Sequence, residues 1–191
     1  MVEVLELKLR FFFRKDFLLF FAVVIVSFFL ASPISAATAS SSDLTYRLRL
    51  FHTHTGQRLD IVYRHGDTYD PDALVQLNEY LRDHRTGDVH VYDPHVFDLL
   101  HDLTVALGRP NSEIDIVCGY RTPWSNEYLR THGHGVARHS LHMQAMAIDI
   151  RVPGVRSSTL RDTALGLGRG GVGYYAASDF VHLDVGRVRR W

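Results

Sequence analysis

Two stretches late in the chain decide the fold: SLHMQAMAIDIRV at residues 140–152 and DFVHLDV at residues 179–185. Apolar and polar residues alternate at the end of the first and throughout the second, as in a strand with one face against a core. The opposite face holds Asp149 in the first strand, and His182 and Asp184 in the second. A carboxylate among apolar neighbours needs a partner, because burying an unpaired charge is very costly. We therefore expect two strands with metal-binding side chains on their non-core faces, and a loop that folds His142 over them.

Helix signals dominate the earlier part of the domain. Thr55-Gly56 separates two strand-like runs, 44–51 and 59–63, and predicts a hairpin. Asp70-Pro71 and Asp93-Pro94 each place a capping residue and a proline at a helix start, and Gly108 ends the second helix. We expect further strands at 113–118, 145–152, 172–175 and 180–185, and further helices at 123–130 and 160–167. Early helices followed by a cluster of strands predict a single α+β domain rather than a parallel βαβ array.

The first 37 residues have the pattern of a secretory signal peptide. Basic residues precede an apolar run at 17–30, and small residues follow it up to Ala39. That run is shorter than the roughly 20 residues of a membrane span, although an uncleaved anchor is the alternative. Arg14-Lys15 resembles a twin-arginine signal only loosely and does not decide the export route. We predict a signal at 1–37, a flexible lead at 38–43, a domain at 44–191, and export to the periplasm or cell envelope.

The charge of the remaining chain excludes some partners. Beyond residue 37 there are 17 Lys and Arg against 18 Asp and Glu, which is close to neutral. A near-neutral chain lacks the net positive charge with which proteins bind nucleic acid or anionic lipid. We expect no nucleic-acid partner, and membrane contact only through a retained signal segment.

Several histidines, the cysteine and a glycine-rich run are expected to have structural roles rather than catalytic or ligand-binding ones. We expect His52 and His54 to be solvated turn residues at the hairpin tip rather than ligands. The single cysteine, Cys118, follows apolar residues and is predicted to be a small core residue rather than a nucleophile. The glycines of 166–173 match G-x-G-x-x-G spacing, but a helix precedes them and a strand follows, the reverse of a dinucleotide site. They are expected to permit a tight turn or a close approach to substrate.

Two imidazoles and one carboxylate match a three-ligand zinc site with a fourth position open. That is the catalytic pattern, because structural zinc sites are usually closed by four protein ligands. Spacing alone leaves open the alternative that His142, Asp149 and His182 have polar or structural roles.

Several motifs in order resemble the M15 metallopeptidases, which include D-Ala-D-Ala carboxypeptidases and dipeptidases. They are Ser140-x-His142 with Asp149, a later Asp179-x-x-His182, and the segment CGYRTP at 118–123 upstream. The runs GGVGYY at 170–175 and HLDVG at 182–186 resemble the murein endopeptidase K subgroup, formerly a domain of unknown function. The resemblance extends from about residue 44 to Trp191. It implies a D-Ala-D-Ala peptidase/hedgehog-like α+β fold, with an antiparallel sheet that carries one zinc ion per chain and helices packed on it.

The resemblance also assigns residue roles. It maps His142, Asp149 and His182 onto the zinc ligands. Asp179 would be the general base that takes a proton from the attacking water and returns it to the leaving amine. Arg121 would stabilise the oxyanion, and Ser140 and Tyr120 would contact substrate. Asp184 is the rival base or a partner that orients an imidazole.

By the same resemblance, the chain is a zinc metallopeptidase that hydrolyses peptide cross-links of peptidoglycan, between diaminopimelate residues. A D-Ala-D-Ala carboxypeptidase would share every ligand, and a non-catalytic, zinc-containing wall-binding module is the third possibility. One departure is Ala145, where the family often has glycine, so a methyl group is expected to narrow the site.

Overall fold

The computed structural model describes residues 44–133 and 135–191. The predicted signal peptide and flexible lead therefore lie outside the described residues. Among the residues that are described, no helix combines the length and the apolar character needed to cross a membrane.

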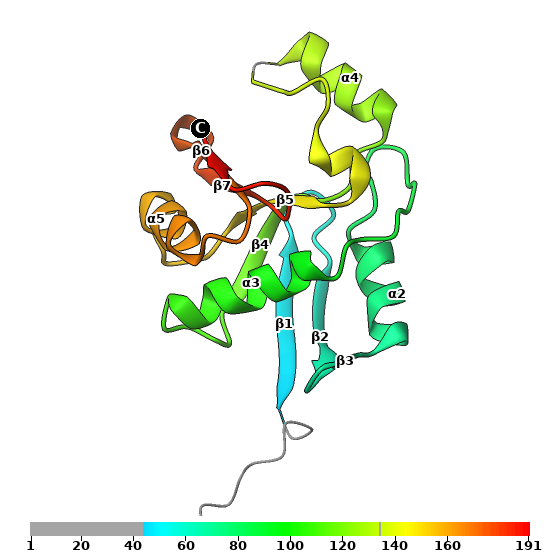
Figure 1. The fold of residues 1–191 in the computed structure, drawn as a ribbon. Helices are drawn as coiled ribbons and strands as arrows, with labels where there is room; N and C mark the ends of the chain where they lie inside the picture. The colour runs from blue at the N-terminus through cyan, green and yellow to red at the C-terminus, as the bar shows by residue number, and fades with distance from the viewer. Residues whose placement is uncertain (1–43, 134) are drawn as a thin grey trace, which may run out of the picture. The chain divides into compact units, whose positions relative to one another are not determined.

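Within these ranges, eight strands form one sheet in the order β3-β2-β1-β4-β5-β7-β6-β8 (Figure 1). The strands are β1 Thr45–His52, β2 Arg58–His65, β3 Thr68–Tyr69, β4 Glu113–Cys118, β5 Ala147–Arg151, β6 Gly171–Tyr175, β7 Phe180–Asp184 and β8 Arg189–Arg190. The pairs β1–β4 and β6–β8 are parallel, so the sheet as a whole is mixed. The inner part, β4-β5-β7-β6, is antiparallel, as predicted for the part that carries the candidate site.

The helices are α2 Pro71–Tyr80, α3 His95–Ala106, α4 Pro123–His132 and α5 Ser157–Leu167, with short 3-10 turns η2 Leu141–Gln144 and η3 Ala176–Ser178. Helices α2 and α4 begin at the predicted prolines, α3 begins one residue after Pro94, and α5 begins at Ser157 rather than at residue 160. Asp70 accepts hydrogen bonds from the backbone N–H groups of Asp72 and Ala73 at 2.9 and 3.2 Å, which satisfies two free donors of α2. The Asp93 carboxylate accepts a hydrogen bond from the N–H of His95, the first residue of α3, at 3.0 Å.

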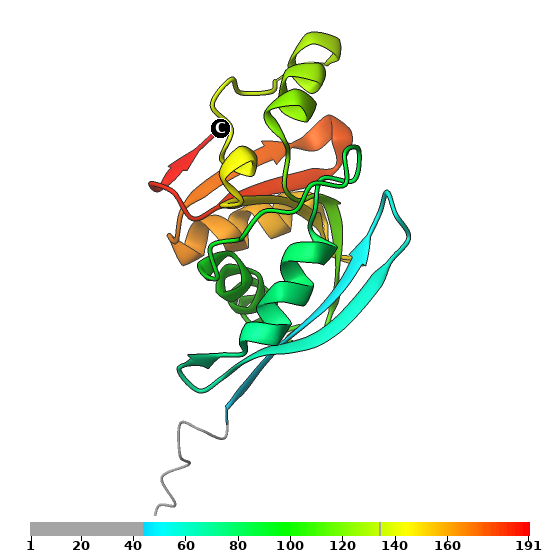
Figure 2. The ribbon, with the colours of Figure 1, turned by 90° about the vertical axis from the view of Figure 1, so that its right-hand side faces the viewer.

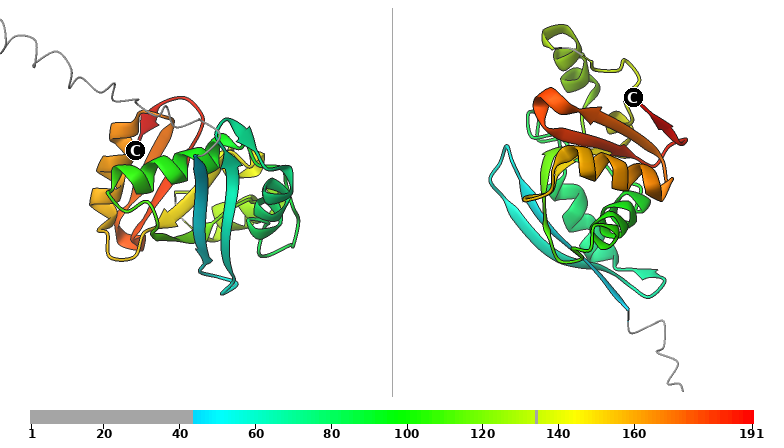
Figure 3. Two further views of the ribbon diagram at one scale, coloured as in Figure 1. Left: turned by 90° about the horizontal axis from the view of Figure 1, so that it is seen from below. Right: turned by 90° about the vertical axis from the view of Figure 1, so that its left-hand side faces the viewer.

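One face of the sheet carries the hydrophobic core. Helices α2, α3 and α5 pack along that face (Figures 2 and 3). Helices and strands share one buried cluster, which includes Leu77, Leu100 and Leu160 of the helices and Leu50 and Ile150 of the strands. Ile148 and Ile150 belong to this core while Asp149 faces away from it, so the predicted alternation of the strand is confirmed. The α+β class is therefore confirmed as well.

The strand predicted to begin at residue 145 begins at Ala147 instead. Ala145 lies in the left-handed region with φ 51°, where it ends η2 and turns the chain into β5. Glycine suits that conformation better than an L-residue, which is a backbone reason for a preference for glycine at this position. The Ala145 side chain is fully buried and does not line the candidate cavity, so its methyl group does not narrow the site as expected.

Candidate metal centre

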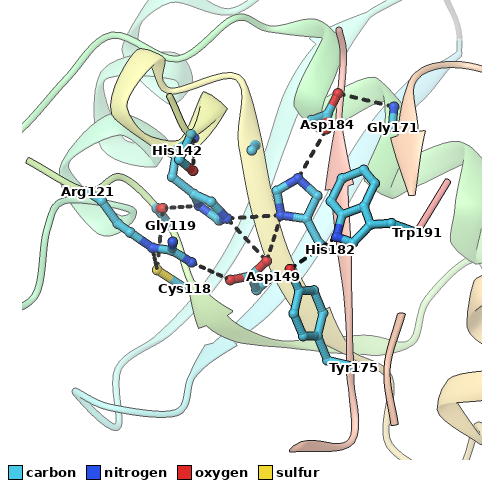
Figure 4. A network of polar contacts seen from close by, with 12 residues as sticks. Cys118, Gly119, Arg121, His142, Asp149, Gly171, Tyr175, His182, Asp184 and Trp191 are labelled. Atoms are coloured by element: carbon cyan, nitrogen blue, oxygen red, sulfur yellow. Dashed lines mark hydrogen bonds and ion pairs between the residues drawn. The ribbon is translucent and has the colours of Figure 1, made fainter. Parts of the chain in front are cut away.

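One row of residues crosses four strands on the face away from the helical core. In the strand register, Cys118 of β4 lies opposite Asp149 of β5, Asp149 opposite His182 of β7, and His182 opposite Gly173 of β6. Residues directly opposite in antiparallel strands point to the same side of the sheet. The sheet therefore brings Asp149 and His182 together, and η2 brings His142 over them (Figure 4).

The three predicted ligands converge on a single point. His142 Nε2 lies 3.1 Å from Asp149 Oδ1 and 3.1 Å from His182 Nδ1, and His182 Nδ1 lies 2.9 Å from Asp149 Oδ1. Tetrahedral zinc with bonds of about 2.0–2.2 Å places neighbouring ligand atoms about 3.3 Å apart. The triangle is within a few tenths of an ångström of that spacing, and two imidazoles with one carboxylate are the donors that zinc prefers. The residues present therefore fit the ion.

Backbone contacts fix the orientation of His142. Its Nδ1 lies 2.7 Å from the carbonyl oxygen of Gly119, so Nδ1 carries the proton and the lone pair of Nε2 faces the other ligands. Ser140 caps η2, accepting a hydrogen bond from the N–H of His142 at 3.3 Å. The N–H of Arg121 donates to the His142 carbonyl at 3.2 Å. The segment after β4 thus clamps the loop that carries His142.

Asp184 orients the other imidazole. Its Oδ2 lies 3.1 Å from His182 Nε2, so His182 Nδ1 faces Asp149 and His142. The same carboxylate accepts from the N–H groups of Gly171 and Gly186, and from Arg189 Nη1 and Nη2 at 2.9 and 2.7 Å. Its side chain is fully buried. Of its two predicted roles, the partner that orients an imidazole matches these contacts, and the carboxylate is fully occupied by them.

The charges of the site compensate one another. Burial opposes ionisation of Asp149, but His142 and His182 more than offset it and hold the pKa of this carboxyl far below its ordinary value. Burial likewise opposes the charged form of His142, yet the Asp149 carboxylate raises the pKa of its imidazole to about 9. Arg121 Nη2 donates to Asp149 Oδ2 at 2.7 Å. Arg121 and the two imidazoles therefore keep the Asp149 carboxylate ionised, and a divalent metal would take the place of protons on those imidazoles.

The ligand cluster borders a cavity of about 210 Å³. All three predicted ligands line this cavity, as do Arg121 and Ser140. The other lining residues are Gly135, Val136, Ala137, His139, Leu141, Tyr175, Ser178, Phe180, Arg189 and Trp191. The cluster is thus open to a substrate on one side, as the catalytic pattern requires.

Two of the predicted site residues do not reach this cavity. Asp179 lies in the turn before β7, and its carboxylate accepts a hydrogen bond from the Ser157 hydroxyl at 2.6 Å. Arg151 holds the backbone of that turn, donating to the carbonyls of Asp179 and Ser178 at 2.6 and 2.9 Å. Tyr120 is buried with its ring 5.0 Å from that of His90.

The histidines at the hairpin tip differ from the prediction in one respect. His52 is 1% exposed, so it is not a solvated turn residue. Its Nδ1 accepts from the N–H of His54 at 3.3 Å, and its ring packs edge-on against Tyr80 and His84. Burial and the nearby His54 and Arg82 lower the pKa of His52 to about 4. It is a neutral packing residue, outside the ligand triangle.

Cys118 is buried, as predicted, but it lies beside the cluster of candidate ligands rather than in the apolar core. A register shift between Ile116 and Cys118 turns its side chain to the face of Asp149. Its Sγ lies 3.1 Å from Arg121 Nε, and Cys118, His142 and Asp149 each place a ligand atom within 4.8 Å of the others. A thiolate in that position would be a fourth ligand and would close the site.

We expect Cys118→Ser to keep full metal content and at least about half of the activity. The reason is that Cys118 Sγ contacts the Arg121 guanidinium, while His142, Asp149 and His182 supply three ligand atoms without the thiol. The measurement is the absorption spectrum of the cobalt-substituted protein, in which a thiolate ligand adds an intense near-ultraviolet band. A band that is present in the wild type and lost in the variant would make Cys118 a ligand and contradict the open site.

Sequence reasoning missed three residues of the site: Tyr175, Arg189 and Trp191. The sequence feature that could have indicated them is the pair of glycines Gly171 and Gly173, which leave space for large side chains. A Cβ at Gly171 would lie 2.3 Å from Asp184 Oδ2 and 2.5 Å from Arg189 Nη1, and one at Gly173 would lie 2.6 Å from the Trp191 indole. These glycines make room for side chains of the site, rather than for a tight turn.

Comparisons with known proteins identify the family of this chain. A model of the M15 peptidase family, described as peptidoglycan L,D-endopeptidase MepK, matches residues 40–191. The probable peptidoglycan L,D-endopeptidase MepK of Haemophilus influenzae is 38% identical over 155 residues, which is 81% of this chain and 81% of the relative. The peptidoglycan L,D-endopeptidase MepK of Escherichia coli K12 is 35% identical over 159 residues, covering 83% of this chain and 87% of the relative. The chain therefore belongs to the MepK family of M15 metallopeptidases.

Proposed function

We propose that this protein is a zinc metallopeptidase of the cell envelope that hydrolyses peptide cross-links of peptidoglycan, at bonds between diaminopimelate residues. The observation that carries the proposal is the triangle of His142, Asp149 and His182 at the edge of an open cavity. The family supplies the substrate class, since its named members are peptidoglycan L,D-endopeptidases.

The chemistry divides between the ion and the side chains. A zinc ion held by the three ligands would act as a Lewis acid on the peptide carbonyl and supply an activated water at neutral pH. Gly119 and Asp184 orient the two imidazoles, and Arg121 holds the outer oxygen of Asp149. This support matters because ligands that are fixed before substrate binds need no rearrangement during the reaction.

Arg121 is proposed to stabilise the oxyanion as well. Its Nη2 and Nε contact Asp149 and Cys118, and Nη1 makes no hydrogen bond with any described residue. Arg121 lines the cavity with its side chain 11% exposed, so Nη1 is available to the oxygen of a bound carbonyl. Ser140 remains a proposed substrate contact at the cavity wall. Tyr120 would need a rearrangement of the His90 contact to become one.

Asp179 is the proposed general base. To act as one, its carboxylate has to leave Ser157 and turn toward the cavity, where the neighbouring Ser178 and Phe180 already form part of the wall. Asp184, the other acid considered, is held by its five polar contacts.

We expect Asp179→Asn to lower kcat by about 100-fold or more, the usual range for loss of a general base, and to leave zinc content unchanged. The matched control is Ser157→Ala, which removes the partner of the carboxylate and leaves the carboxylate itself. Steady-state rates on a cross-linked muropeptide dimer are the measurement. Equal rates for wild type and Asp179→Asn would remove Asp179 from catalysis without affecting the enzyme assignment.

The function itself is tested on purified sacculi incubated with the zinc-loaded protein, with the released muropeptides identified by mass spectrometry. An endopeptidase converts cross-linked dimers into monomers. A carboxypeptidase releases free D-Ala and leaves the dimers intact, and a binding module releases neither. A sample treated with chelator is the control. Absence of any product with zinc bound would contradict the proposal.

A further inference from the structure

The side chain of Trp191 forms one wall of the cavity. Trp191 extends β8 alongside β6, with its N–H donating to the Val172 carbonyl at 3.3 Å and its carbonyl accepting from the N–H of Tyr174 at 3.0 Å. Its indole lies over Gly173, in space that any Cβ would fill, and 5.2 Å from the His182 ring between centroids. The backbone pairing places the Cα of Trp191, and the contacts with Gly173, His182 and the Arg189 guanidinium place its indole.

The indole holds the hydroxyl of Tyr175. Trp191 Nε1–H donates to Tyr175 Oη at 3.1 Å. On its other side, the Tyr175 ring stacks on Phe180, with 4.5 Å between ring centroids and 15° between planes. Tyr175 lines the cavity, and its phenol points toward the cluster of Asp149 and His182 (Figure 4). Both the ring and its oxygen are therefore fixed in place.

The direction of that hydrogen bond leaves the proton of the phenol free. An indole N–H can only donate, so Tyr175 Oη is the acceptor and its own O–H is not used by Trp191. In the part of the chain that the structure describes, no other group accepts a hydrogen bond from Tyr175. The cavity wall thus contains a neutral donor, fixed on the His182 side of the site.

On the opposite side of the site, two of the three guanidinium nitrogens of Arg121 already contact other side chains. Arg121 Nη2 donates to Asp149 Oδ2, and Nε donates to Cys118 Sγ. A tetrahedral intermediate is best stabilised by more than one positioned donor. Tyr175 is the candidate for the second.

We propose that Tyr175 is a further catalytic residue, whose hydroxyl donates a hydrogen bond to the oxyanion formed at the scissile carbonyl, and that Trp191 positions it. This rests on the proposed peptidase function. As water adds to the carbonyl carbon, the π electron pair moves to the oxygen, and the Tyr175 O–H bonds to that oxygen without giving up its proton. The contact strengthens as negative charge develops, so it lowers the barrier more than it tightens binding of the substrate.

The test is Tyr175→Phe, which retains the ring and its stacking on Phe180 and removes only the hydroxyl. We expect kcat on a cross-linked muropeptide dimer to fall about 100-fold, as for loss of one oxyanion donor, with KM changed less than about twofold. A phosphinic pseudopeptide, with a tetrahedral phosphinate in place of the scissile amide, should bind more weakly by the factor lost in kcat/KM. Calorimetric titration measures that affinity independently of turnover, and zinc content should remain at one equivalent.

Two further variants separate catalysis from structure. Trp191→Phe retains an aromatic ring and removes the donor that orients the hydroxyl. It should lower kcat about 10-fold, less than loss of the hydroxyl itself, again with KM unchanged. Tyr174→Phe is the matched control, because the adjacent Tyr174 lies on the other face of β6 and packs under Arg161. It should retain the wild-type rate.

Outcomes for this inference and for the proposed function are distinct. Wild-type release of muropeptides together with a Tyr175→Phe rate within about threefold of wild type overturns the role of Tyr175 and leaves the peptidase intact. An equal loss in kcat and in phosphinate affinity, with KM unchanged, supports the role. Absence of wild-type activity overturns the peptidase, and the inference falls with it.

Discussion

Replacing His142 by alanine is expected to remove bound zinc almost completely and to abolish muropeptide release. The site offers three ligand atoms within 3.1 Å of one another, and a catalytic zinc site holds its metal with three. Loss of one leaves a two-ligand site, in which Asp149 keeps only its contacts with Arg121 and His182. Even loss of an outer hydrogen-bond partner weakens metal sites by about 10–100-fold, so loss of an inner ligand should exceed 100-fold.

The measurement is metal analysis of the purified protein beside its rate on sacculi. The control is His95→Ala, because His95 is exposed at the start of α3, and it should retain one equivalent of zinc and the wild-type rate. Full metal content in His142→Ala would exclude the triangle as the binding site. The search would then move to His139 at the cavity wall or to His52 and His54.

The parts of this fold that sequence could predict are those set by local patterns. The strand alternation at Ile148–Ile150 is a period-two pattern and correctly separated the core face from the face of Asp149. The start of α2 follows from Asp70-Pro71, because a capping carboxylate and a proline act on neighbouring residues alone. The ligand triangle itself was reached only through the family motifs, because spacing does not show how η2 folds over the sheet.

What sequence could not show depends on contacts between distant segments. Alternation along β4 assigns Cys118 to the core with Ile114 and Ile116, and a single bulge reverses that assignment. The sequence places both Asp179 and Asp184 near His182. Only the tertiary structure shows that Asp184 contacts Arg189 and the imidazole, while Asp179 contacts Ser157. Trp191 reaches the site through pairing of β8 with β6, a contact that no local pattern encodes.

Replacing Asp184 by asparagine is expected to cost about 3 kcal/mol of stability and to weaken zinc binding about 10–100-fold. The carboxylate is fully buried and joins His182, Arg189 and the N–H groups of Gly171 and Gly186. An amide keeps one acceptor oxygen but loses the negative charge, so Arg189 is left without its ion pair. Because Arg189 is 32% exposed, water compensates for part of that loss. The stability cost therefore falls at the low end of the range for a broken buried pair.

The pH dependence of this effect has a definite sign. Burial opposes the charged form of Asp184, but the His182 and Arg189 side chains and the N–H of Gly186 outweigh it and hold its pKa well below the ordinary value. A carboxyl with a lowered pKa in the folded state contributes its full stability above its unfolded pKa of about 3.9, and loses it as the pH falls further. Thermal unfolding of the metal-free proteins should therefore show the largest gap between wild type and Asp184→Asn at neutral pH. The gap should narrow below about pH 4.

Asp162→Asn is the control for this prediction, since Asp162 is 64% exposed and pairs with its neighbour Arg161 at the surface. Its stability should stay close to that of wild type at every pH. A gap between wild type and Asp184→Asn that stayed constant down to pH 3 would mean that lost packing, rather than lost charge, causes the effect. Unchanged zinc affinity in Asp184→Asn would show that His182 keeps its orientation without the carboxylate. The indole of Trp191 beside that imidazole would then be the contact to alter next.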